Sequence, residues 1–357
     1  MLEISFTVAD LARTGLAISP LWEVAASVRR LKAPRPGPLY RHWTEAVRPR
    51  LAGAGTGVQL LFDLVQPASW YSPDFLAPPP RTPLPDLTAE LTGLRALPAD
   101  QIRADLDVFA HALTHPIGSL DEVTRPRRRP AGPIRTAPSA RIASLYDDPP
   151  GGLELLAAGI EAYWRIAIEP WWGRIRRTLE ADLLYRGRQL ARGGHALLLD
   201  DLAPEVRWHD DVLRIRHRRF TGHRQLHGEG LLLVASAFVG QRVMSSTIPP
   251  WQPCLTYPAR GLGTVWEAAR VDPPAAVSRV LGRSRATLLA QLALPTSTTE
   301  LAARTGLTPG GVSQHLGALH GAGLVSAHRV GRTVLYARTD LAESLLGGLA
   351  AFDRPPR

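Results

Sequence analysis

Hydrophobic positions between residues 284 and 338 follow three successive patterns, which predict helices first and a hairpin afterwards. The first pattern is an apolar face at helical spacing, formed by Leu288, Leu289 and Leu292. The second is a stripe at i, i+4 and i+7 on a later helix, formed by Val312, Leu316 and Leu319. The third consists of two runs rich in β-branched and aromatic residues, 324–330 and 333–337, which predict two strands.

Polar residues and glycines between these runs predict where the helices begin and where the chain turns. Thr298 is expected to cap a short second helix. Gly306 follows that helix where a left-handed residue turns the chain, because glycine has no Cβ to clash there. Thr308 is an N-cap candidate for the next helix, and Pro309 stands at its first position, where a missing N–H costs nothing. This order of helix, turn, helix and hairpin predicts a winged helix-turn-helix.

The same segment resembles the DNA-binding domain of the ArsR/SmtB family of bacterial transcription regulators. The resemblance is carried by VSQHL at 312–316 and LHGAGLV at 319–325, which are similar to the family's recognition helix and its exit into the wing. It implies that residues 273–350 form a winged helix-turn-helix DNA-binding domain. The alternative is a small helical hairpin used only for protein contacts.

Candidate DNA contacts lie off the apolar stripe, near the helix end that enters the major groove in helix-turn-helix proteins. They are Thr308, Gly310, Gly311, Ser313, Gln314 and His315. Gln314 can pair bidentately with adenine, whereas Ser313 and His315 can donate to phosphates or base edges. The two glycines depart from the family's larger polar residues and are expected to let a phosphate approach the helix N-terminus closely. A solvated helix face is the alternative.

Two arginines flank Gly331 at the tip of the predicted wing. The guanidinium groups of Arg329 and Arg332 suit phosphate or a narrow minor groove, and an exposed hairpin charge is the alternative. The whole chain carries a net charge of +10, which favours a polyanionic partner. Lys32 is the only lysine, so part of this arginine bias is compositional and says nothing about DNA.

The length of 357 residues suggests two or three domains. One cysteine, Cys254, excludes an internal disulfide framework and favours a reducing compartment. The N-terminus lacks the pattern of a signal peptide, and no run of 18 apolar residues exists. We therefore expect a cytoplasmic protein that makes no membrane contact.

Residues 1–270 are predicted to form a sensing or oligomerisation region, mostly helical up to about residue 113. Amphipathic spacing predicts helices at 20–31, 39–51, 86–97, 99–113 and 153–192, the last with a break at Pro170. Strand-like periods at 206–216, 230–239 and 253–257 then predict a small antiparallel sheet. The fold class is therefore α+β, with a large, mostly helical N-terminal region ahead of the C-terminal winged helix.

Several short stretches of this region resemble the long leader domain found ahead of an ArsR-type winged helix in some actinobacterial regulators. They are LAISPLWEV near the start, EPWWGRI at 169–175, LLLVASAF at 231–238 and YPARG at 257–261. The resemblance implies an architecture and no chemistry. Residues 124–141, rich in arginine and proline, predict a solvated linker, with an extra phosphate contact as the alternative.

No metal, cofactor or catalytic site is predicted. Ser297 and Thr299 stand where many ArsR relatives have metal-sensing cysteines, so the resemblance implies that a soft-metal site is absent. The histidines of the strand region have no metal-ligand spacing and are expected to be surface or pairing residues: His209, His217, His223 and His227. The run Gly53, Gly55 and Gly57 lacks a preceding strand and predicts a loop.

Four aromatic residues at 163–172 are a candidate ligand pocket, although aromatics at helical spacing are more often core: Tyr163, Trp164, Trp171 and Trp172. Together these observations predict a ligand-responsive repressor that binds double-stranded DNA as a homodimer. It has a small-molecule effector and no enzymatic activity. The alternative is an enzyme or a protein-interaction module that carries an accessory winged helix.

Overall fold

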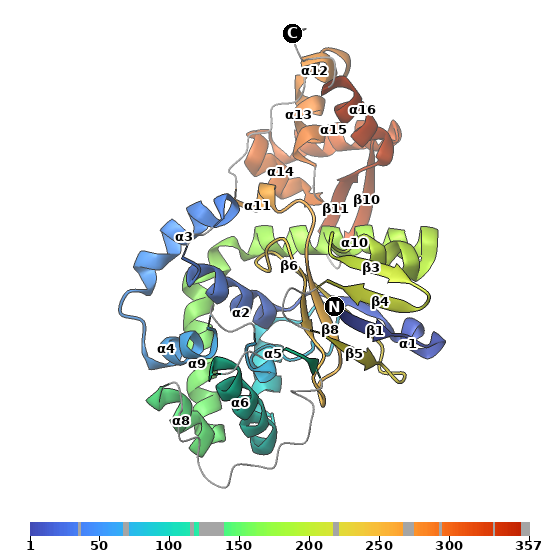
Figure 1. Ribbon diagram of the computed structural model, residues 1–357. Coiled ribbons are helices and arrows are strands. Elements are labelled where there is room, and N and C mark those ends of the chain that lie inside the picture. Colours follow the sequence, from blue (N-terminus) through green and yellow to red (C-terminus); the bar gives the residue numbers. More distant parts are fainter. Residues whose placement is uncertain are drawn as a thin grey trace. The chain divides into compact units, whose positions relative to one another are not determined.

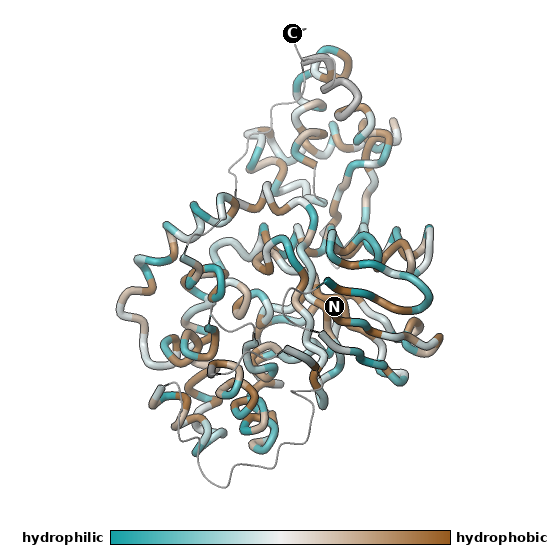
Figure 2. The backbone as a smooth tube through the Cα atoms, viewed as in Figure 1, coloured by the Kyte–Doolittle hydropathy of each residue, from teal (hydrophilic) through white to brown (hydrophobic). Residues whose placement is uncertain are grey.

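The computed structural model divides the chain into two compact units, Met1–Arg260 and Gly261–Arg357 (Figure 1). Along both units hydrophobic and hydrophilic residues alternate within single helices, as amphipathic elements require (Figure 2). The structure describes residues 1–34, 37–66, 71–114, 118–120, 139–216, 221–266, 275–292, 295–330 and 333–350.

The first sheet of unit 1 has the strand order β3-β4-β1-β5. Strand β1 (Leu2–Ser5) lies between β4 (Val212–Ile215), to which it is antiparallel, and β5 (Gly222–Gln225), to which it is parallel. Strand β3 (Val206–His209) forms the edge beside β4. Alternate side chains face the core, because successive residues of a strand point to opposite faces. The N-terminal residues therefore complete a sheet whose other strands follow some 200 residues later.

The second sheet of unit 1 has the order β2-β6-β8-β7. Strands β2 (Gly15–Ala17) and β8 (Cys254–Pro258) both run parallel to the central strand β6 (Leu232–Ser236). Strand β7 (Met244–Ser246) pairs antiparallel with β8 at the edge. Almost every residue of β6 and β8 is buried, as expected for parallel strands covered on both faces.

The helices of unit 1 gather around α9 (Pro149–Ala167), which contacts α2, α4, α5, α6, α8 and α10. Helix α10 (Glu169–Asp200) then runs against both sheets through β3 and β6, and it is kinked at Gly193 and Gly194. The remaining α-helices are α1 (Val8–Arg13), α2 (Pro20–Leu31), α3 (Arg41–Val47), α4 (Thr56–Leu64), α5 (Leu87–Arg95), α6 (Ala99–Thr114) and α8 (Ala140–Asp147). Short 3₁₀ helices are η1 (Pro38–Tyr40), η2 (Arg48–Leu51) and η3 (Asp74–Leu76).

Helix α2 is anchored to the end of strand β6 by a buried carboxyl group. Glu23 accepts the backbone N–H of Ala237 at 3.0 and 3.1 Å, and the Tyr40 hydroxyl donates to the carbonyl oxygen of the same residue at 3.0 Å. Arg30, two turns further along α2, donates from Nε to the carbonyl oxygen of Phe238 at 2.7 Å. Burial raises the pKa of Glu23 to about 8. The carboxyl group is therefore largely protonated in the folded protein at neutral pH.

Helices α4 and α9 cross at a pair of glycines. A Cβ on Gly159 would overlap the carbonyl group of Gly57, and a Cβ on Gly57 would overlap the carbonyl oxygen of Leu155. The backbones can approach this closely only because neither position carries a side chain. Gly57 was expected in a loop. It lies instead in helix α4, at the point where α4 crosses α9.

Unit 2 contains helices and one three-stranded sheet of order β10-β11-β9. Its strands are β9 (Thr296–Ser297), β10 (Val325–Val330) and β11 (Thr333–Arg338). Its helices are α11 (Gly263–Trp266), α12 (Ala275–Leu281), α13 (Arg283–Gln291), α14 (Thr298–Thr305), α15 (Pro309–Gly321) and α16 (Asp340–Ala350). One hydrophobic core joins α13, α14, α15, the wing and α16.

The predicted α+β class with a C-terminal winged helix is confirmed, and several details are corrected. The expected small antiparallel sheet is two mixed sheets, because β1 and β2 within the first 17 residues pair in parallel with distant strands. The helix expected at 39–51 is divided into η1, α3 and η2, and α3 ends at Val47 because Pro49 follows two residues later. No helix among the described residues is long and apolar enough to cross a membrane.

The arginine- and proline-rich segment 124–141 lies outside the described residues, except for its last three positions. There Ser139 caps α8, and its hydroxyl also donates to Asp63 at 2.7 Å. Arg141 donates from Nε to the same carboxylate at 2.8 Å. These residues hold α8 against α4 and so have a structural role.

Gly159→Ala is expected to destabilise the protein by on the order of 3 kcal/mol, because α4 and α9 must separate to admit a methyl group. Gly187→Ala is the matched control, since this glycine is exposed on α10 and a Cβ there would meet nothing within 4 Å. The control should be neutral or stabilising by up to about 1 kcal/mol. Urea unfolding of the two variants measures the difference. Equal effects of both substitutions would contradict the glycine crossing.

The buried Glu23 predicts that stability falls as pH rises. The folded chain keeps a proton up to about pH 8 that the unfolded chain loses near 4.5. The unfolding free energy therefore decreases between these two values, by about 1.4 kcal/mol per pH unit for this group, and levels off above. Glu23→Gln should remove this contribution, so wild type and variant unfolded in urea at pH 5, 6, 7 and 8 should differ in slope. Parallel pH profiles would refute the assignment.

Candidate nucleic-acid interface

The turn between α14 and α15 is built from two capped helices and one left-handed glycine. The Ser297 hydroxyl accepts from the N–H of Glu300 at 3.3 Å, so Ser297, rather than the expected Thr298, is the N-cap of α14. Gly306 ends that helix with a φ of 73°. Thr308 then caps α15, accepting from the N–H of Gly311 at 3.2 Å, and Pro309 is the first helical residue. The predicted turn and second cap are confirmed.

The stripe of α15 is buried as its spacing predicts. Val312 and Leu316 are fully buried and Leu319 is 2% exposed. They belong to one core with the leucines of α13 and α14, so the contacts fix the rotation of α15 about its own axis. The opposite face of the helix is thereby turned to solvent.

Most of the predicted DNA contacts on α15 lie on that solvent face. Thr308, Gly310, Ser313 and Gln314 are exposed, whereas Gly311 and His315 are half-buried. Neither Ser313 nor Gln314 uses its side chain in a hydrogen bond with another described residue. Both side chains therefore keep their full hydrogen-bonding capacity for a partner outside the chain.

The two glycines at the start of α15 differ in what they do. A Cβ on Gly311 would lie 3.2 Å from the Thr308 hydroxyl, so glycine there leaves room for the capping hydrogen bond. A Cβ on Gly310 would meet nothing within 4 Å. Packing among the described residues therefore gives no reason for glycine at 310, which leaves the backbone N–H groups of the first turn open to an approaching anion.

The wing is anchored on the start of α14. Strands β10 and β11 are antiparallel, with Arg329 opposite Val334, and β11 continues into a pairing with β9 that sets Leu335 opposite Ser297. The residue that caps α14 thus also belongs to the sheet, a contact that local patterns could not predict. Arg329 is exposed on β10, and Arg332 lies outside the described residues.

Some arginines of unit 2 form ion pairs within the unit, whereas others have no ion pair with a described acidic residue. Arg304 pairs with Glu300 at 2.6 Å on α14, and Arg338 pairs with Glu343 at 3.2 Å. Arg283 and Arg285, at the start of α13, are exposed and have no ion pair with a described acidic residue. Sequence reasoning did not single these two out, because an exposed arginine and a paired one look alike in a sequence.

The remaining sequence candidates are distributed over unit 1 without forming a site. No group of three or more histidine, cysteine or acidic residues is arranged to hold a metal among the residues that the structure describes. His223 forms a hydrogen bond through Nε2 with the Ser5 hydroxyl at 2.7 Å. The Nδ1 atom of His209 lies 2.7 Å from the Asp210 carboxylate. His217 lies outside the described residues.

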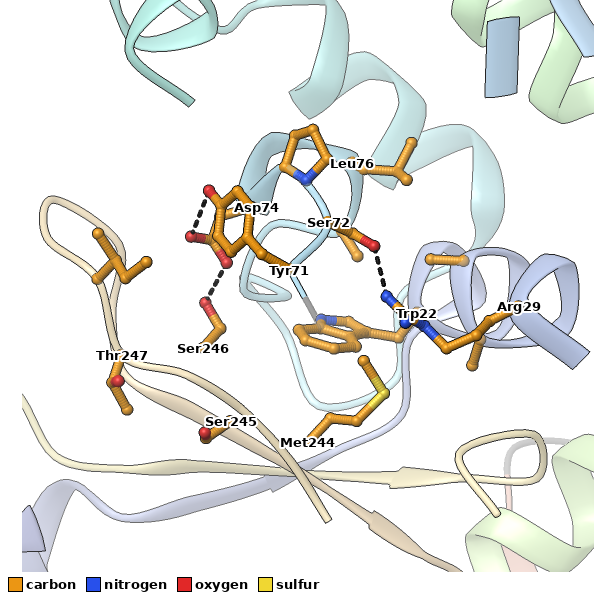
Figure 3. A pocket seen from close by; sticks show the side chains of 15 residues that line it. Trp22, Arg29, Tyr71, Ser72, Asp74, Leu76, Met244, Ser245, Ser246 and Thr247 are labelled. Atoms are coloured by element: carbon orange, nitrogen blue, oxygen red, sulfur yellow. Dashed lines mark hydrogen bonds between the residues drawn. The ribbon is translucent and has the colours of Figure 1, made fainter. Parts of the chain in front are cut away.

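Three of the four aromatic residues at 163–172 pack in the core or on each other. Tyr163 is fully buried, and its hydroxyl lies 2.8 Å from that of Ser27. Trp164 makes an edge contact with Trp172, with ring centroids 4.8 Å apart. These aromatic residues do not line the pocket of unit 1 whose walls come from α2, residues 71–77 and residues 244–248 (Figure 3).

Comparison with known families divides the chain in two. Residues 1–263 match the model of a family of unknown function, DUF5937. The chain belongs to this family. Residues 286–327 match the model of the bacterial regulatory protein ArsR family, which covers the helix-turn-helix and the first residues of the wing. No curated protein and no solved structure matches the chain. The ArsR-family helix-turn-helix supports a DNA-binding transcriptional regulator, and the DUF5937 region precedes it.

Gly310→Ala tests whether the open helix N-terminus meets a DNA phosphate. The substitution should leave the stability of unit 2 unchanged or raise it by up to about 1 kcal/mol, since alanine favours helix and the space is empty. The affinity for duplex DNA should nevertheless fall severalfold, because the methyl group keeps the phosphate away from the backbone N–H groups. Gly317→Ala, equally exposed and unobstructed but two turns further along α15, is the control in titrations at one salt concentration. Unchanged DNA affinity of Gly310→Ala would exclude this contact.

Proposed function

We propose that this protein is a ligand-responsive transcriptional repressor that binds an inverted-repeat operator as a homodimer in the cytoplasm. The observation that carries the proposal is the N-terminal half of α15. Its apolar stripe is buried, its first turn is capped and open, and Ser313 and Gln314 project from it without a hydrogen-bond partner among the described residues. This is the arrangement that lets a recognition helix enter the major groove.

Base readout is assigned to Gln314, because its amide can accept from and donate to the edge of adenine at once. Ser313 and His315 donate to phosphates or neighbouring base edges. Thr308, Gly310 and Gly311 form the first turn, which receives a phosphate at the positive end of the helix dipole. Arg329 and Arg332 contact the backbone from the wing, where the guanidinium group suits phosphate.

Repression follows from occupation of a promoter by the bound dimer. A two-fold dimer presents two copies of α15, so the operator is an inverted repeat with half-sites about 10 base pairs apart, centre to centre, or a multiple of that spacing. The effector acts by binding one conformation of the dimer better than the other, which shifts the population that fits the operator. Unit 1 is large enough to sense the effector and to carry part of the dimer contact.

Gln314→Ala is expected to weaken binding to the preferred operator by about 1–3 kcal/mol and to change binding to random DNA little. A lost base contact removes discrimination, whereas the phosphate attraction that holds random DNA survives. The measurement is a pair of titrations of operator and scrambled duplex at one salt concentration, with an operator selected from a randomised duplex library.

His320→Ala is the matched control for this experiment, because His320 is exposed on the same helix but lies near its C-terminal end. It should leave both affinities unchanged. If Gln314→Ala lowers the affinity for operator and scrambled duplex equally, Gln314 contacts the DNA backbone and the assignment of base readout is wrong.

A further inference from the structure

Unit 1 contains a pocket between helix α2, the segment around η3 and strand β7 (Figure 3). Its cavity volume is about 70 Å³, several times the roughly 10–15 Å³ that one water molecule needs, and it opens to solvent. The three walls are far apart in sequence, at residues 22–29, 71–77 and 244–248, so the pocket exists only in the folded unit.

Most of the pocket wall is apolar, and its polar residues include hydrogen-bond donors as well as the carboxyl group of Asp74. Trp22 is 7% exposed and lines the pocket, yet its indole Nε1 has no hydrogen-bond partner among the described residues. A buried N–H without an acceptor is costly, so an acceptor from outside the chain is favoured there. The Arg29 side chain lines the same pocket two turns further along α2, and it donates to the Ser72 hydroxyl at 2.7 Å. The pocket wall thus carries a positive charge and, buried in it, an indole N–H that has no partner among the described residues.

The acidic side of the pocket is already occupied by internal hydrogen bonds. Asp74 accepts from the Ser246 hydroxyl at 2.7 Å and from the Tyr71 hydroxyl at 3.2 Å, as Figure 3 shows. Asp105 beside it accepts the N–H of Phe75 at 2.8 Å. Burial raises the pKa of Asp74 to about 6 and that of Asp105 to about 8. These carboxyl groups tie η3 to β7 and α6, and Asp105 stays largely protonated at neutral pH.

We propose that this pocket is the effector site and that it takes a small aromatic carboxylic acid. The carboxylate accepts from Arg29 and from the Trp22 N–H, and the ring packs against the indole and the apolar side chains of Met244 and Ile248. Charge-assisted hydrogen bonds from a guanidinium are among the stronger polar contacts that a site can offer a carboxylate. This inference rests on the proposed ligand-responsive function and names the class of ligand and its site.

The pocket wall is connected to the chain that enters unit 2. Strand β7 pairs with β8, with Ser246 opposite Cys254, and β8 leads through Tyr257 to Arg260, where unit 1 ends. Asp182 of α10 fixes the position of residues 257–260, because it accepts from the Tyr257 hydroxyl at 2.8 Å and from the N–H of Arg260 at 3.0 Å. A ligand packed against β7 therefore contacts the strand that pairs with β8, and the chain continues from β8 to the winged helix.

Three naphthalene probes of equal size test the charge preference by isothermal titration of the full chain without DNA. They are 2-naphthoate, 2-naphthalenemethanol and 2-naphthylmethylammonium. Naphthoate should bind about tenfold or more tightly than the alcohol, and the ammonium probe should bind most weakly, because Arg29 attracts the anion and repels the cation. Binding of the ammonium probe at least as tight as that of naphthoate, or no binding of any probe, would overturn the proposal.

Two variants locate the bound probe. Arg29→Gln should lower the affinity for naphthoate to that for the alcohol, and Trp22→Phe should weaken naphthoate severalfold while keeping an aromatic wall. Arg165→Gln, at an exposed arginine of α9 that does not line the pocket, is the control and should change nothing. Thermal unfolding confirms that each variant is folded. Trp22→Phe keeps the test decisive if Arg29→Gln does not fold, and unchanged naphthoate affinity in Trp22→Phe would place the probe elsewhere.

A separate DNA titration distinguishes the two proposals. Naphthoate at saturating concentration should change the affinity of wild type for the selected operator and leave that of Trp22→Phe less affected. If naphthoate binds in the pocket but the operator affinity does not change, the effector role fails and DNA binding stands. If the protein binds no operator at all while naphthoate binds, the proposed function fails and the binding site stands.

Discussion

The burial of one stripe of α15 is the constraint on which the DNA-binding surface depends. Val312, Leu316 and Leu319 pack into the core of unit 2, and this contact leaves a single rotation of the helix about its axis. Ser313 and Gln314 must then face solvent, because they lie on the opposite side of the helix. Gly306, in the left-handed conformation, turns the chain between α14 and α15. The Thr308 cap fixes the residue at which α15 begins. These polar side chains are presented to solvent because the apolar ones are held inside.

Unit 1 is organised by long-range contacts. Strands β1 and β2 pair with strands more than 200 residues away, and α2 is fixed to the end of β6 by the buried Glu23. Helices α4 and α9 meet backbone to backbone at Gly57 and Gly159. These contacts bring α2, the η3 segment and β7 together, and the pocket forms where the three meet.

How far the sequence predicts this structure depends on the range of each contact. The Gly306 turn, the Thr308 cap, the α15 stripe and helix α2 rest on residues a few positions apart, and all were predictable. The pairing of Ser297 with Leu335 was missed because it spans 38 residues and no local pattern contains it, although the cap that Ser297 forms with the N–H of Glu300 is local. The parallel pairings of β1 and β2 were missed for the same reason. The pocket could not be predicted either, since Trp22, Tyr71 and Met244 are adjacent only in space.

The central claim is that unit 2 reads a DNA sequence. The most direct test is to select duplexes from a randomised library with the full chain and to titrate the selected and the unselected duplexes at several salt concentrations. The account predicts one recovered motif with two inverted half-sites, bound about a thousandfold or more tightly than unselected DNA. It also predicts an affinity for both duplexes that falls as salt rises. Recovery of no common motif, with equal affinity for all duplexes, would contradict it.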